Sequence, residues 1–328
     1  MLNQLEQLWQ IPVNLSGRGQ LWADLWWGLN RLRIRRGTVE HYVGEFAGSA
    51  VRITTIGRTK HALPFCEDML GELEFVGRTD RSDSSTPHDL GRLSGDLVVT
   101  EIHPRQADAF RDSNWLVLPG WVRWRGDLRR VATQPPRSLK SDLNKVQAHG
   151  YECKQSLESR DWQEFWHTMV EPYAVSRFAE WAWVPSWALR RIFEHFGVLH
   201  FVYHDRRRVA GFAALCSGRR GWFPVLGILP EPELRRQGIV AAIYRFTFDW
   251  ARDQGLTSID LGRSEAFVND GLGQYKRKWG LEPIADPMSH LLSLRIGPAV
   301  AAAFKEEPVR VLTRSGLRIY AGESDWQE

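Results

Sequence analysis

Two short segments carry side chains whose types and spacing could do chemistry. Residues 271–280 read GLGQYKRKWG and place Lys276 in a triply basic stretch bounded by glycines. Residues 257–265 read TSIDLGRSE and place Asp260 and Glu265 shortly before it. A fixed cation can stabilise developing negative charge, and a carboxylate can accept a proton. These residues are therefore candidates for catalysis that combines charge stabilisation with proton transfer.

A third segment, LRRQGIV at residues 234–240, could bind the phosphates of an acyl donor. A glycine-bearing turn lets backbone N–H groups face an anion, and the helix predicted after it adds partial positive charge at its N-terminus. The alternative is an ordinary helix start with solvated arginines. The predicted donor-binding residues are Arg235, Arg236, Gln237, Gly238 and Ile239.

Other catalytic arrangements are not evident in the sequence. The three cysteines, Cys66, Cys153 and Cys216, are scattered, which argues against a disulfide framework and for a reducing compartment. No Ser-His-Asp order and no metal-like spacing is present. We therefore expect direct attack by the amine, with no metal and no tightly bound cofactor. Asp260 alternates with Ile259 and Leu261, so a purely structural role is the alternative for it.

The elements that must position these residues are clearest in the second half of the chain. A Pro-Pro linker at 131–142 precedes a helix that Gly150 ends. Glycines likewise follow the predicted helices that end near 196 and 255. The expected order is helices at 160–175 and 186–196, strands at 198–205, 209–218 and 221–229, a helix at 233–255, a strand at 256–264, a helix of about two turns after Gly271, and a strand near 287–295.

Length and charge bear on the number of domains and on the kind of partner. With 328 residues the chain is comfortable for two domains. There are 43 basic and 39 acidic residues, which is compatible with an anionic partner. No segment approaches the roughly 18 continuous apolar residues of a membrane span, and no signal peptide is evident at the start, so a cytoplasmic location is expected.

The predicted order of elements resembles the Gcn5-related N-acetyltransferase (GNAT) fold. In that family the loop before the long helix takes the pyrophosphate of coenzyme A with the pattern Arg/Gln-x-x-Gly-x-Gly/Ala. Arg235 and Gly238 fit this pattern, whereas Val240 departs from it at the last position. A branched side chain there could crowd a pyrophosphate, so the resemblance implies the fold more firmly than it implies the donor.

The segment from Tyr275 to Gly280 resembles the Phe-Lys-x-x-Trp/Phe-Gly motif of Fem-like and BioF2-like acyltransferases. The resemblance spans roughly residues 136–295 and implies that Lys276 stabilises the oxyanion. It implies an α/β tandem GNAT fold, with mixed, mostly antiparallel sheets flanked by helices. The domains expected are a degenerate GNAT-like domain at 1–136, a GNAT domain with the active cleft at 137–295, and a C-terminal helix and tail at 296–328.

The sequence thus predicts an enzyme, an N-acyltransferase that forms an amide on a small metabolite or peptide precursor. Aminoacyl-tRNA is the slightly favoured donor; the alternatives are an acyl-CoA-dependent acyltransferase and a non-catalytic RNA- or partner-binding protein. Lys276, Asp260 and Glu265 are the predicted catalytic residues. The predicted substrate-binding residues are Arg177, Trp181, Arg263, Ser264 and Tyr275.

Overall fold

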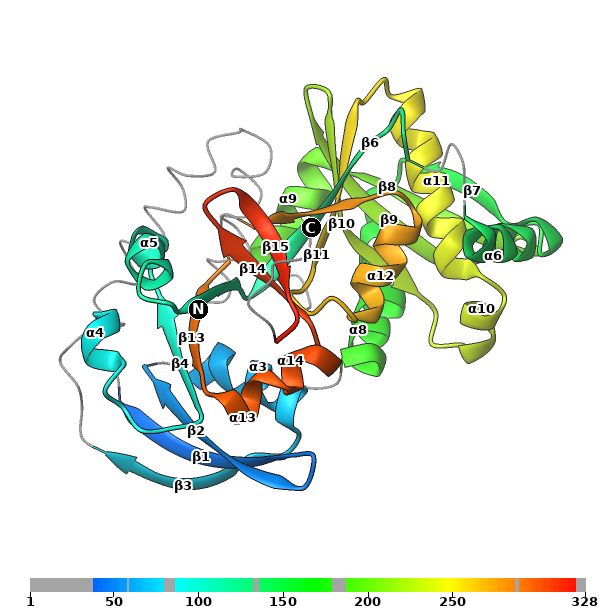
Figure 1. Cartoon of the computed structure of the whole chain (residues 1–328). Coiled ribbons are helices and arrows are strands. Elements are labelled where there is room, and N and C mark those ends of the chain that lie inside the picture. The colour runs from blue at the N-terminus through cyan, green and yellow to red at the C-terminus, as the bar shows by residue number, and fades with distance from the viewer. Residues whose placement is uncertain are drawn as a thin grey trace. The chain divides into compact units, whose positions relative to one another are not determined.

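The computed structural model describes residues 38–57, 59–79, 86–131, 136–178, 187–286 and 289–322. The chain forms two compact units, each built from segments that are not consecutive in the sequence. Among the described residues, the seven-stranded unit holds 124–262 and 275–282, and the six-stranded unit holds 38–123, 263–274 and 283–322. Figure 1 labels their elements.

The strands and helices follow one another in mixed order along the chain. The strands are β1 Val39–Phe46, β2 Ser49–Ile56, β3 Glu74–Thr79, β4 Leu97–Ile102, β5 Leu116–Pro119, β6 Trp121–Asp127, β7 Glu152–Ser156, β8 Val198–His204, β9 Arg207–Ser217, β10 Arg220–Ile228, β11 Ser258–Glu265, β12 Glu282–Ala285, β13 Leu291–Ile296, β14 Val309–Thr313 and β15 Gly316–Tyr320. The helices are α3 Thr59–Leu70, α4 Pro87–Leu90, η1 Pro104–Gln106, α5 Ala107–Arg111, α6 Arg137–Ala148, α7 Ser159–Glu164, η2 Phe165–Val170, α8 Glu171–Phe178, α9 Trp187–Phe196, α10 Pro232–Arg236, α11 Ile239–Asp253, α12 Gly271–Lys278, α13 Pro298–Ala301 and α14 Ala303–Glu306.

The six-stranded unit is built on a sheet of order β3-β1-β2-β4-β13-β5. Its strands pair antiparallel except β2 and β4, which are parallel. Adjacent residues of β4 point to opposite faces, so Val99 packs with the cluster that includes α3 and α14, and Val98 packs with the cluster that includes α5. Helices therefore cover both faces of this sheet.

Strand β13 does not lie where its sequence position suggested. The final strand predicted near 287–295 was expected to complete the second domain. In the structure Leu291–Ile296 lies between β4 and β5, and Leu292 pairs with Glu101 on one side and with Leu118 on the other. The pattern of β13 predicts a buried strand but cannot name its partners, because these are nearly 200 residues away in sequence.

The seven-stranded unit is built on a sheet of order β12-β6-β11-β10-β9-β8-β7. Its central strands are apolar on both faces, which predicts a cover on each side. On one face Phe201 packs with the aromatic side chains of η2 and α9. On the other, His200 stacks on Phe212 and meets Trp250 of α11 edge to face. Helices therefore enclose this sheet too (Figure 1).

The helix predicted at 160–175 is interrupted by a π-helical stretch, η2. It packs on β10 at Gly227, where an added Cβ would lie 2.7 Å from the Cβ of Met169 and 2.8 Å from the backbone nitrogen of Val170. The amphipathic pattern gave no sign of the wider turn. Such turns occur often at functional sites.

The predicted fold class, mixed α/β with mostly antiparallel sheets flanked by helices, is confirmed. The predicted helix at the linker is α6, and Gly150 follows it with φ +58°. The long helix predicted at 233–255 is divided into α10 and α11 at Gly238.

Candidate active site

The predicted donor loop joins α10 to α11 in the seven-stranded unit. Gly238 caps α11 with φ +87°, in the left-handed region that favours glycine. An added Cβ would lie 3.1 Å from the Cβ of Lys145, so the loop packs directly on α6. Arg235 and Arg236 are exposed, whereas Gly238 and Ile239 are buried and Gln237 is half-buried.

This loop lies at the start of a helix and directly follows two exposed arginines. The first N–H groups of an α-helix have no partner within the helix, and the helix dipole adds positive charge there. Arg236 forms an ion pair of 2.5 Å with Glu233 of its own helix. Arg235 forms no ion pair within the described part of the chain and remains available to a phosphate.

In the same unit, β10 and β11 begin as partners and then separate. Their parallel ladder comprises three pairs and ends at Trp222 and Asp260. Strand β10 continues to Ile228 beside β9, after a bulge between Trp222 and Val225. The backbone nitrogen of Leu229 donates to the carbonyl of Val209 on β9 (3.0 Å). Because backbone groups alternate in direction along an antiparallel strand, those of Leu226 and Ile228 point away from β9.

Lys276 lies on α12, and Asp270 directly precedes this helix. Asp270 accepts from the backbone nitrogens of Gly273 (2.6 Å) and Leu272 (3.3 Å) and so caps the helix. This cap was not predicted, although an Asp directly before a predicted helix is a recognised signal. A Cβ at Gly271 would meet open space, so that position does not require glycine.

One face of α12 is buried. Lys276 is 2% exposed, and Trp279 is 1% exposed. Tyr275 and Trp279 meet Tyr244 of α11 with ring centroids 5.2 and 5.6 Å apart. Arg277 and Lys278 are exposed, so the buried lysine is the one that the sequence motif singles out.

Asp260, one of the two predicted bases, is held in a structural arrangement. It is buried and accepts from the backbone nitrogen of Gly262 at 2.9 Å. A guanidinium nitrogen of Arg125 lies 3.7 Å from its carboxylate. Gly262 has φ +75°, so the Asp260 carboxylate stabilises a turn within β11.

Glu265, the other predicted base, lies at the end of β11 in the six-stranded unit. Burial raises the pKa of this carboxyl to about 7, with smaller contributions from the charges of Asp68 and Asp270. A carboxylate with this pKa can take a proton near neutral pH, which is the property that a general base requires.

The predicted substrate-binding residues differ in what the structure shows. Arg263 pairs with the buried carboxylate of Asp286, which also lies 3.8 Å from a guanidinium nitrogen of Arg123. Sequence reasoning missed Asp286 and Arg123, because nothing in the local pattern links them to Arg263. Ser264 is buried, and Tyr275 is half-buried with a raised pKa.

The two remaining predicted substrate-binding residues are Arg177 and Trp181. Arg177 lies in α8, and its side chain is outside the described residues. Trp181 lies outside them altogether.

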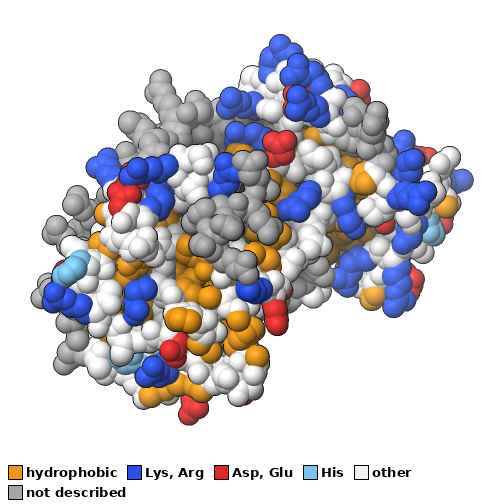
Figure 2. All heavy atoms as spheres, in the orientation of Figure 1, with side chains coloured by type: hydrophobic (Ala, Val, Ile, Leu, Met, Phe, Trp, Pro, Cys, Tyr) orange, Lys and Arg blue, Asp and Glu red, His pale blue; other side chains and the backbone are white. Residues whose placement is uncertain are grey.

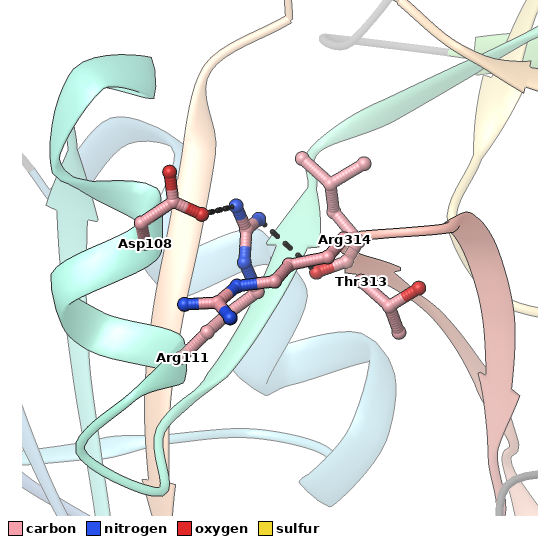
Figure 3. A pocket seen from close by; sticks show the side chains of 5 residues that line it. Asp108, Arg111, Thr313 and Arg314 are labelled. Carbon is pink, nitrogen blue, oxygen red and sulfur yellow. Dashed lines mark hydrogen bonds and ion pairs between the residues drawn. The ribbon is translucent and has the colours of Figure 1, made fainter.

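A cavity of about 570 Å³ lies elsewhere, between α5 and the β14–β15 hairpin of the six-stranded unit (Figure 3). Arg111 pairs with Asp108 and donates to the carbonyl of Leu312 at 3.3 Å. Arg314 pairs with Asp112 at 2.8 Å. The charged side chains that line the cavity therefore form ion pairs within the protein. None of the predicted site residues lines this cavity.

Two further kinds of feature are absent from the described residues. No three or more His, Cys, Asp or Glu side chains are grouped there so as to hold a metal ion. None of the helices in the same residues has the length and apolarity needed to span a membrane.

Comparison with known proteins gives one family match. The family model described as an acetyltransferase (GNAT) domain matches residues 137–277. No curated protein matches the sequence significantly. Among solved structures, L-PGS from Bacillus licheniformis is 11% identical with a TM-score of 0.41, covering 78% of this chain and 84% of that one. FemX is 10% identical with a TM-score of 0.40, covering 82% and 90%. A GCN5-related N-acetyltransferase from Kribbella flavida is 14% identical with a TM-score of 0.33, covering 60% and 66%. These structural similarities are remote, whereas the family model matches at the level of sequence and covers residues 137–277.

Proposed function

Since a family model of an acetyltransferase (GNAT) domain matches residues 137–277, we propose that the chain is an acyltransferase that transfers an aminoacyl group from aminoacyl-tRNA to an amine. The product is an amide on a small metabolite or a peptide precursor. The observation that carries the proposal is the burial of Lys276, whose two basic neighbours on the same helix are exposed.

In the proposed reaction the amine attacks the acyl carbonyl directly. The new bond joins the amine nitrogen to the acyl carbon, and the bond from that carbon to the ribose oxygen breaks. Lys276 stabilises the oxyanion, because a fixed cation with little access to water interacts strongly with developing charge. Glu265 accepts the proton of the ammonium, and the ribose oxygen leaves with a proton. No tightly bound cofactor or metal is required.

The donor-binding role of residues 235–239 is part of the same proposal. The left-handed cap at Gly238 and the exposed guanidinium of Arg235 suit a phosphate. Coenzyme A is the second candidate donor, favoured by the fit of Arg235 and Gly238 to the pyrophosphate pattern. Arg263, Ser264 and Tyr275 remain proposed contacts to the acceptor, as do Arg177 and Trp181.

The test is a donor comparison with the full chain. tRNA charged with labelled amino acids and acetyl-CoA labelled in its acetyl group are each incubated with a mixture of amines. The expected result is label in a base-stable amide with charged tRNA only. Label from acetyl-CoA alone would replace the donor with the second candidate. Transfer from neither donor would overturn the acyltransferase proposal and favour the non-catalytic alternative.

A further inference from the structure

We propose that the exposed face of α6, together with α10, is a docking surface for the phosphate backbone of an RNA. This inference rests on the proposed function, in which tRNA carries the acyl group. It goes beyond that function by assigning the surface that holds the body of the RNA, apart from the loop that receives its acylated end.

Helix α6 is apolar on one side and basic on the other. Leu139 and Val146 are buried and fix the helix to its unit. Arg137, Lys140 and Lys145 are exposed. At about 100° per residue, Arg137 lies opposite the buried pair, and Lys140 and Lys145 lie on the two flanks of the helix. At 1.5 Å per residue, the distance from Arg137 to Lys145 along the helix axis is roughly 12 Å.

This basic face is continuous with the donor loop. The Cβ position of Gly238 lies 3.1 Å from the Cβ of Lys145 and 3.4 Å from the carbonyl oxygen of Asp142, so α6 abuts the start of α11. Arg235 is exposed on α10 immediately before that loop. Figure 2 shows Lys and Arg side chains along the side of the molecule where Figure 1 places α6 and α10.

The cations of this surface are not neutralised by acidic side chains among the described residues. Arg137, Lys140, Lys145 and Arg235 form no ion pair within that part of the chain. Nearby arginines do: Arg236 pairs with Glu233, and other surface arginines of the unit are similarly engaged. Cations that bind a phosphate backbone release its counterions, which is the main source of affinity for nucleic acid.

The length and chemistry of the surface favour RNA over other anions. A strip of roughly 12 Å extends beyond a single diphosphate. An anionic membrane is the other large partner, but interfacial helices also insert apolar side chains. The exposed large hydrophobic residues described in this unit lie on other elements: Leu157, Val175, Trp187 and Phe196.

The experiment measures binding of uncharged tRNA to the full chain over a series of salt concentrations. The test variant is K140E/K145E. The matched control is R219E/R220E, which reverses two exposed charges of the same unit at the β9–β10 turn, the opposite end of β10 from α10. Circular dichroism and thermal unfolding establish that both variants are folded.

At about 50 mM salt, K140E/K145E is expected to weaken tRNA binding about tenfold or more. It should also reduce the slope of log Kd against log salt concentration by about 0.7–0.9 for each phosphate that the variant no longer neutralises. The control should bind within about twofold of wild type. Equal losses in both variants, or no change in either, would overturn the surface assignment. Binding to vesicles of phosphatidylglycerol that depends on Lys140 and Lys145, without binding to tRNA, would assign the face to a membrane instead.

Failure of the surface assignment can be distinguished from failure of the proposed function. If charged tRNA is a donor but its KM is the same in wild type and K140E/K145E, the surface assignment fails alone. If tRNA binds through α6 but no acyl transfer occurs, the proposed reaction fails and the docking surface stands.

Discussion

Lys276 differs from the two basic residues after it because its side chain is removed from water. If this cation acts on the oxyanion, Lys276→Ala should lower kcat about 10²–10³-fold and leave KM nearly unchanged. Steady-state kinetics with the donor that the labelling experiment selects measures both constants. Lys278→Ala is the control and should be nearly neutral, because Lys278 is exposed. Equal losses at both positions would mean that the basic triplet binds a partner electrostatically.

If Glu265 is the base, the reaction depends on pH. Its pKa is raised to about 7, so the carboxyl is protonated below this pH and cannot accept a proton. We expect kcat/KM to rise with pH and to level off above about pH 7. In Glu265→Gln this inflexion should disappear. Asp68→Asn removes a neighbouring charge that raises the pKa of Glu265, so the inflexion should move to lower pH. An unchanged profile in Glu265→Gln would exclude this residue as the base.

For single residues, the sequence indicated which residue types to consider but not which side chains pair with them. The choice of Lys276 over Arg277 and Lys278 followed from the family motif and stays a prediction; Lys276 is the buried residue of the three. The ion pair of Arg263 with Asp286 could not be predicted, because its geometry is set by the tertiary fold.

Among the elements, α11 depends on the glycine that caps its N-terminus. Gly238→Ala places a side chain at φ +87° and 3.1 Å from the Cβ of Lys145. The left-handed conformation alone costs about 1–2 kcal/mol in a residue with a side chain. Urea unfolding should show a loss of stability of at least this size. Gly271→Ala is the matched control, since its Cβ meets open space, and it should not destabilise the protein. Equal stability of the two variants would contradict the conformational argument.

Local pattern predicted most elements of the seven-stranded unit. Helix α6, helix α9 and strands β8 to β10 lie within a few residues of their expected bounds, because periodicity and terminal glycines are local signals. The π-helical η2 was not predicted, because its wider turn accompanies a close approach to Gly227 of a distant strand. The partners of β13 were missed for the same reason.

For the molecule as a whole, the two units should respond oppositely to mild acid. His200 of the seven-stranded unit is 5% exposed, and burial lowers its pKa to about 4 from 6.5. The unfolded chain therefore binds a proton that the folded unit excludes, and stability falls as the pH falls from about 6.5 to 4. Glu265 of the six-stranded unit has a raised pKa, so its contribution to stability is lost as the pH rises from about 4.5 to 7.

Thermal unfolding at pH 7.5 and pH 5 measures this balance. By linkage, His200 should cost the seven-stranded unit about 2 kcal/mol at pH 5. His200→Phe retains a ring against Phe212 and Trp250 and should remove that loss. Glu265→Gln serves as the comparison, because it should change the pH dependence of the six-stranded unit only. A variant at His200 with wild-type acid sensitivity would show that this ring does not titrate on unfolding.

The position of β13 between β4 and β5 has a consequence during biosynthesis. Strand β5 ends at Pro119, but the strand that it pairs with begins at Leu291, 172 residues later. At about 5–20 residues per second, a ribosome needs roughly 10–35 s to deliver it. Through that interval the nascent six-stranded sheet has two unfilled edges, while the seven-stranded unit is synthesised in between. Strands β4 and β5 thus stay without their shared partner until β13 has been synthesised. A chaperone that shields their free edges would act on this protein before its release from the ribosome.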